Sequence, residues 1–113
     1  MTSFRIKQIN ELIQKILSEI LQKEYQFPSD ALVTILGVET SPDLLYSKII
    51  VSVFPIGQGA EIIKYLEKEI FGIQQSLNKK LVMRPIPKIR FELDTTEFEA
   101  EKIEKILGEI KSE

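Results

Sequence analysis

The chain has 113 residues, a formal net charge of −2 and a hydrophobic fraction of 43%, and it contains neither cysteine nor histidine. This length suits one domain, and the composition is that of an ordinary globular protein rather than a disordered one. Because histidine is the commonest general base near neutral pH and a leading zinc ligand, we expect neither an enzyme nor a metal or cofactor site. The sequence shows no signal peptide and no apolar run near the ~20 residues that span a bilayer, so we expect a cytoplasmic protein.

Residues 3–24 are predicted to form the first helix. Apolar residues recur at spacings of three and four, which draws a stripe along one side of an α-helix. They are Ile6, Ile9, Leu12, Ile13, Ile16, Leu17, Ile20 and Leu21. Pro28 prevents the helix from continuing.

Residues 32–54, LVTILGVETSPDLLYSKIIVSVF, predict an antiparallel β-hairpin. Both runs are rich in β-branched residues, and Pro42 lies in the turn between them. Gly37 inside the first run predicts a bulge. In the second run, the four residues Ser47, Ile49, Val51 and Val53 alternate with Tyr46, Lys48, Ile50 and Ser52. This alternation predicts a sheet that is covered on one face only.

A second helical pattern follows the PIGQG loop and extends to Leu81. Its stripe consists of Ile62, Ile63, Leu66, Ile70, Ile73, Leu77 and Leu81. Glycine inside a helix costs about 1 kcal/mol relative to alanine. Gly72 is therefore either a tolerated weak point or the site of a helix break, and we take it as the candidate break.

Residues 88–93 alternate between charged and apolar side chains and are predicted to form a third strand, which follows two prolines. Thr96 and Glu99 form a candidate capping box at the start of a final helix. More than thirty residues separate strands two and three, which is enough for a right-handed crossover that makes them parallel. We therefore expect an α+β fold in one domain, residues 1–113, with the order α-β-β-α-(break)-α-β-α. Its three-stranded mixed sheet is covered by helices on one face, and residues 95–113 form a C-terminal helical extension.

Two segments carry a resemblance to a known family. GVETSPDLLYSK contains Val38, Glu39, Ser41, Pro42, Asp43, Leu44, Tyr46 and Lys48, and PKIRF contains Pro87, Arg90 and Phe91, with Asp94 shortly after. Together with the flanking helices, these segments resemble ribosome-binding factor A, a bacterial assembly factor of the small ribosomal subunit. The resemblance covers nearly the whole chain.

The resemblance implies a type II KH-like fold in which an interrupted helix replaces the usual GxxG loop, and this chain has no GxxG. It also implies binding to free small subunits and their rRNA late in maturation, support for 5′-end processing of that rRNA, and a role in growth at low temperature. Two features depart from the family pattern. First, bulky Phe71 precedes Gly72, and no basic residue follows Gly72 closely. Second, the chain as a whole is slightly acidic.

Lysine and arginine pair with phosphates, and residues 70–91 hold five of them and no acid. The candidate RNA-binding residues are Lys79, Lys80, Arg84, Lys88 and Arg90 in this segment, together with Lys48, Arg5 and Lys7. Strand alternation predicts that Lys48, Lys88 and Arg90 lie on one exposed face. The same charges can equally be solvated residues that keep a helix end and a sheet face soluble.

These observations favour a non-enzymatic, monomeric assembly factor that binds small-subunit rRNA and no membrane. The alternative is a protein-interaction module that recruits a partner through the open sheet face or an edge strand. A hydrolase or nuclease would need a carboxylate metal site or an unusual serine base, and the sequence shows no paired motif of either kind.

Overall fold

The structure is a computed structural model that describes residues 4–94. In chain order the elements are α1 (Phe4–Glu24), the 3-10 turn η1 (Pro28–Asp30), β1 (Leu32–Thr40), β2 (Tyr46–Phe54), the 3-10 turn η2 (Ile56–Gln58), α2 (Gly59–Lys68), α3 (Ile70–Lys80) and β3 (Lys88–Leu93). The predicted order is confirmed as far as β3. The predicted helical extension, residues 95–113, lies outside the described residues.

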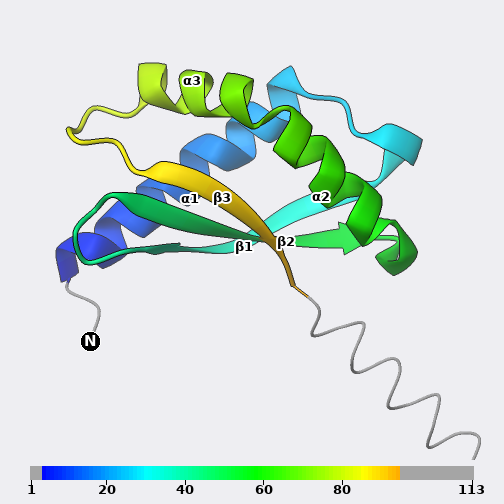
Figure 1. Ribbon diagram of the computed structural model, residues 1–113, viewed down its shortest axis with the longest axis horizontal. Helices are drawn as coiled ribbons and strands as arrows, with labels where there is room; N and C mark the ends of the chain where they lie inside the picture. The colour runs from blue at the N-terminus through cyan, green and yellow to red at the C-terminus, as the bar shows by residue number, and fades with distance from the viewer. Residues whose placement is uncertain (1–3, 95–113) are drawn as a thin grey trace, which may run out of the picture.

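The three strands form one mixed sheet in the order β1-β2-β3. β1 runs antiparallel to β2, and β2 runs parallel to β3, as the crossover predicted. Figure 1 shows α1, α2 and α3 gathered on one side of this sheet. The strands that carry the candidate RNA-binding residues therefore have one face turned away from the helices.

The inner face of the sheet forms the core with the three helices. In β2, residues 47, 49, 51 and 53 are buried, and their neighbours in the sequence are more exposed. The fully buried helix residues are Ile13, Leu17, Ile20, Ile62, Leu66, Ile73 and Leu77. Burying a side chain of this size contributes roughly 1.5–3 kcal/mol, so this apolar contact is the main stabilising term. The stripe on α1 is narrower than predicted, since Leu12 is exposed.

One polar side chain, Ser47, is buried within the described core. Its hydroxyl lies 2.8 Å from the Thr40 hydroxyl, which in turn donates a hydrogen bond of 2.5 Å to the Asn10 carboxamide. A buried hydroxyl without a partner would cost about 1–3 kcal/mol. The chain of contacts from Asn10 to Ser47 therefore satisfies the group and ties α1 to the hairpin.

The hairpin loop is ordered by its own polar side chains. Ser41 donates to the Asp43 carboxylate at 2.6 Å, and this bond, with a second from the Leu45 amide, holds the pKa of Asp43 below its usual value. Leu44 has a positive φ of 63°. The predicted bulge is also present, because the β1–β2 register shifts between Ile35 and Gly37.

The helix interruption lies at Glu69, so the predicted break at Gly72 is wrong. Glu69 has φ −93° and ψ 4°, which separates α2 from α3, and Gly72 lies inside α3. A Cβ at position 72 would lie 2.9 Å from the Tyr25 hydroxyl oxygen. Gly72 is therefore explained by the close approach of Tyr25, which follows the end of α1.

Both outer edges of the sheet are contacted by a glutamine from a helix. Gln14 in α1 donates to the Ile35 carbonyl at the β1 edge, at 3.0 Å. Gln74 in α3 accepts from the Ile89 amide at 2.9 Å and donates to the Pro87 carbonyl at 3.1 Å. A carboxamide in this position mimics the backbone of a neighbouring strand, and unpaired edges are the places where sheets aggregate.

If Tyr25 is the reason for Gly72, the effect of Gly72→Ala must depend on the Tyr25 hydroxyl. Alanine improves helix propensity by about 1 kcal/mol, but its Cβ must displace that hydroxyl. We expect Gly72→Ala to leave stability nearly unchanged in the parent and to stabilise the Tyr25→Phe variant by about 0.5–1 kcal/mol. Urea denaturation of all four proteins measures the coupling, and equal effects in both backgrounds would contradict this explanation.

Gln74→Ala removes both hydrogen bonds at the β3 edge and leaves the Ile89 amide and Pro87 carbonyl without protein partners. Since both groups are partly buried in this contact, we expect a destabilisation of about 1–3 kcal/mol by chemical denaturation. Gln75→Ala is the matched control, because Gln75 is the next residue of α3 and is exposed. A Gln74 variant no less stable than this control would show that solvent replaces the carboxamide without cost.

Candidate nucleic-acid interface

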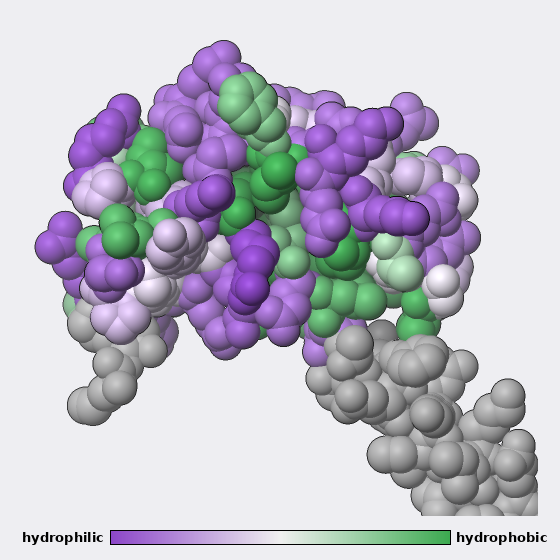
Figure 2. Space-filling view, viewed as in Figure 1, coloured by the Kyte–Doolittle hydropathy of each residue, from purple (hydrophilic) through white to green (hydrophobic). Residues whose placement is uncertain are grey.

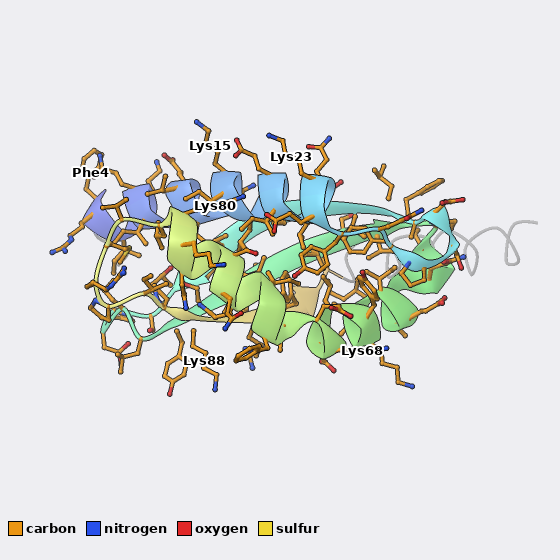
Figure 3. All side chains as sticks on the ribbon, turned by 90° about the horizontal axis from the view of Figure 1, so that it is seen from above. Phe4, Lys15, Lys23, Lys68, Lys80 and Lys88 are labelled. Carbon is orange, nitrogen blue, oxygen red and sulfur yellow. The ribbon has the colours of Figure 1, made fainter. Side chains whose placement is uncertain are left out.

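The C-terminal end of α3 carries Lys79 and Lys80. The Lys80 Nζ lies 3.0 Å from Glu24 Oε2 at the end of α1, and Ser76 donates to Glu24 Oε1 at 3.0 Å. These two bonds, the Lys80 contact first, hold the pKa of Glu24 below its usual value. Figure 3 shows Lys80 on the α3 turn that faces α1. The arrangement directs one of the two lysines toward an acid.

Arg84 and Lys88 share a hollow of ≈ 500 Å³ beside α3, which is also lined by Gln74, Asn78 and Ile86. The Arg84 guanidinium donates to the Met83 carbonyl at 2.7 Å, which leaves its other N–H groups available. The Asn78 carboxamide accepts a bond of 3.0 Å from Gln74 and keeps its own donors. This hollow therefore combines two cations with a neutral amide, a set of groups that suits phosphate oxygens.

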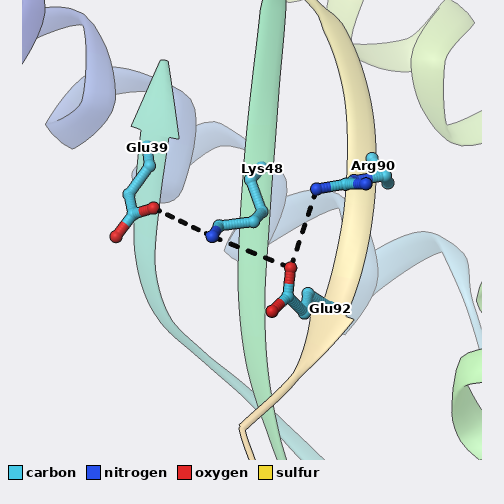
Figure 4. A network of polar contacts seen from close by, with 4 residues as sticks. All are labelled: Glu39, Lys48, Arg90 and Glu92. Carbon is cyan, nitrogen blue, oxygen red and sulfur yellow. Dashed lines mark ion pairs between the residues drawn. The ribbon is translucent and has the colours of Figure 1, made fainter. Parts of the chain in front are cut away.

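The open face of the sheet carries Lys48 and Arg90, whose Cα atoms are partners across β2 and β3. The predicted strand alternation is confirmed, since Lys88 and Arg90 are exposed on this side. Both cations at the centre of the face have acidic partners, as Figure 4 shows: Lys48 lies 3.1 Å from Glu39 and 3.7 Å from Glu92, and Arg90 lies 3.7 Å from Glu92. The contact with Glu39, and then the charge of Glu92, raises the pKa of Lys48.

The basic segment, residues 70–91, is thus surrounded by more negative charge in the folded chain than its sequence indicates. Three acids from outside residues 70–91 pair with its cations or with Lys48: Glu24, Glu39 and Glu92. The hairpin register could have revealed the pairing of Glu39 with Lys48. Glu24 is separated from Lys80 by 56 residues, and no local pattern indicates their contact. Within residues 4–94, Lys79, Arg84 and Lys88 make no salt bridge, so they are the most available cations.

Tyr46 lies at the start of β2, and its Cα partner in β3 is Lys88. The Tyr46 side chain is 60% exposed. Together with Lys48 and Lys88, it lines a hollow of ≈ 830 Å³. An exposed aromatic ring among cations is a common element of single-stranded RNA sites.

Arg5 and Lys7 are exposed on the first turns of α1. Among the contacts of the described part of the chain, none joins them to the cations of α3 or the sheet. Figure 3 also shows that Lys88 projects on the opposite side of the molecule from Lys15 and Lys23 of α1. By element, the eight predicted residues lie on β2 and β3, at the end of α3 and in the loop after it, and, for Arg5 and Lys7, at the start of α1.

Figure 2 shows polar side chains over most of the visible face, with small apolar areas between them. Among residues 4–94, no three His, Cys, Asp or Glu side chains are grouped so that they could hold a metal ion. No helix in that range is long and apolar enough to cross a membrane.

Comparison with known sequences identifies the family. Residues 5–107 match the profile of the family "Ribosome-binding factor A". A ribosome-binding factor A from Natranaerobius thermophilus is 32% identical over 111 residues, which cover 97% of this chain and 85% of the relative. One from Clostridium perfringens is 33% identical over 114 residues, covering 98% of each chain.

Solved structures agree with this result. The solution structure of a putative ribosome-binding factor A from Thermotoga maritima has a TM-score of 0.66 and 28% identity, covering 81% of this chain and 89% of its own. The crystal structure of the Thermus thermophilus factor has a TM-score of 0.65 and 20% identity over 78% and 93% of the two chains, which shows a shared fold. A homology model of the Thermus factor, fitted into a map of a 30S–factor complex, has a TM-score of 0.61 and 21% identity over 75% and 90%. The profile match and the nearly full-length relatives show that this chain belongs to the ribosome-binding factor A family, with the KH-like fold of its solved members.

Proposed function

We propose that this protein binds the free small ribosomal subunit through its rRNA, as a non-enzymatic assembly factor in the cytoplasm. Family membership carries the proposal, and the Thermus relative fitted into a map of its complex with the 30S subunit supports it. The finer roles that we attach to this function are support for late maturation and 5′-end processing of small-subunit rRNA, and growth at low temperature.

We assign the first RNA contacts to Arg84, Lys88 and Lys79. They make no salt bridge within the described residues, so phosphates can pair with them without displacing an acid. We rank Lys80, Lys48 and Arg90 as weaker RNA contacts. Each of them must first break a salt bridge to a carboxylate at 3.0–3.7 Å. Repulsion between those carboxylates and phosphate groups also narrows the area over which RNA can approach.

The alternative of a protein-interaction module that uses a sheet edge has less support. Gln14 and Gln74 already bond to backbone groups on the two outer strands. An added strand would have to displace these carboxamides before it could pair along the edge.

The central test replaces the three cations assigned to the first RNA contacts by glutamine: Lys79→Gln, Arg84→Gln and Lys88→Gln. The variant should bind purified small subunits more weakly, and the slope of log affinity against log salt should fall by about two to three units, because each phosphate contact contributes roughly 0.7 to 0.9. Stability should change little, since these side chains are exposed. Binding at several salt concentrations and thermal melting provide the two measurements.

The matched control carries Lys15→Gln, Lys64→Gln and Lys68→Gln, which remove the same charge from exposed positions on α1 and α2. It should keep most of the affinity and the salt slope. If both triple variants bind equally well, Lys79, Arg84 and Lys88 are solvated surface residues and the assignment of this site is wrong.

A second test releases Lys80 from its acid. Glu24→Gln removes the charge of the carboxylate but keeps groups that can bond to Ser76, so Lys80 becomes free to contact phosphate. We expect small-subunit binding to tighten and to depend more steeply on salt. Glu19→Gln, at an exposed position of the same helix, is the control. Equal binding by the two variants would restrict Lys80 to a structural role between α1 and α3.

A further inference from the structure

The open face of the sheet has an apolar half beside its charged half. We define the apolar half as Leu32, Leu36, Ile50 and Phe54. Leu32 and Phe54 are Cα partners and are 64% and 65% exposed. Leu36 is the extra residue of the β1 bulge, next to the Gly37–Ile50 pair, and is 51% exposed. Strand alternation places all four residues opposite the buried Ile35, Val51 and Val53.

These four apolar side chains, with the Thr34–Ser52 pair between them, form a surface that favours a partner. Fully burying a leucine or phenylalanine contributes roughly 1.5–3 kcal/mol relative to leaving it exposed. Contiguous exposed apolar areas in soluble proteins commonly mark docking surfaces. The Glu39, Lys48, Arg90 and Glu92 network borders this half, since Lys48 is two residues from Ile50 on the same face.

The chain leaves the sheet next to this apolar half. Leu93, the last residue of β3, pairs with Val51, and the Asp94 amide donates to the Val51 carbonyl at 2.7 Å. Phe54 lies three residues further along β2 in the same direction. The nineteen residues after Asp94 can extend up to ~60 Å, whereas nine-residue strands such as β1 and β2 span only about 30 Å. The C-terminal segment can therefore reach every part of the open face.

The composition of residues 95–113 complements that face. The segment carries five large apolar residues, Phe98, Ile103, Ile106, Leu107 and Ile110, and the last four follow helical spacing. It also carries six acids against three lysines, a charge opposite to that of Lys48, Lys88 and Arg90, which outnumber Glu39 and Glu92 on the same face. We propose that residues 95–113 dock on the open face of their own sheet, with the apolar stripe on Leu32, Leu36, Ile50 and Phe54 and the acids toward Lys48 and Arg90. Covalent attachment raises the effective concentration of this occupant above that of any free partner.

Paramagnetic NMR on the full chain tests the docking directly. Because the chain has no cysteine, Ser112→Cys provides a single site for a spin label. In the 15N-labelled protein, the active label should at least halve the amide signals of Leu36 and Ile50 relative to the reduced label, and should affect buried residues of α3 much less. Adding Leu32→Asp and Phe54→Asp should restore the Leu36 and Ile50 signals, and substitutions at these exposed positions should leave the thermal melting of the fold unchanged.

The control mixes spin-labelled 14N protein with unlabelled 15N protein. Signal loss in this mixture would show contact between copies and would overturn docking within one chain. Unchanged Leu36 and Ile50 signals in the labelled chain, or losses confined to the helices, would equally overturn the proposal. None of these readouts involves RNA, so the docking and the proposed ribosomal function can fail independently.

Discussion

The structure depends on the burial of one face of β2. This strand lies between β1 and β3, so its inner residues Ile49 and Val51 contact the helices while its backbone pairs on both sides. The three helices lie on this face because it alone is continuously apolar. Their position leaves the opposite face open, and that face holds Lys48, Lys88 and Arg90 as well as the exposed apolar residues. This open, mixed surface is therefore a consequence of covering a sheet from one side.

Features governed by local rules were predictable from the sequence. Alternation in β2 and β3 placed Lys48 and Arg90 on one face, Gly37 indicated the bulge, and the long connection predicted the parallel pairing of β2 with β3. Nearly the whole described fold follows from such patterns. They succeed because strand alternation and helical spacing depend on neighbours in the sequence.

Features governed by distant contacts were not predictable. A glycine in a helix suggests a break, but the reason for Gly72 is Tyr25, which lies 47 positions earlier and approaches only in the folded chain. The interruption itself falls at Glu69, where no glycine or proline marks it. In the same way, the run of cations in residues 70–91 appeared free of acids until folding brought Glu24 to Lys80. The cations could be assigned to their helix and strands from the sequence, but the distant acid that pairs with Lys80 in the folded chain could not.

The two edge glutamines have a consequence for the order in which the chain is made. Gln14 precedes β1 in the sequence and Gln74 precedes β3, so a ribosome releases each carboxamide before the strand edge that it contacts. Domains begin to form from the N-terminus during synthesis, and unpaired edges are the surfaces on which emerging chains associate wrongly. The glutamine that contacts each outer strand has therefore already been synthesised when that strand leaves the exit tunnel. Only the side of β2 that awaits β3 must stay open while the intervening helices are translated.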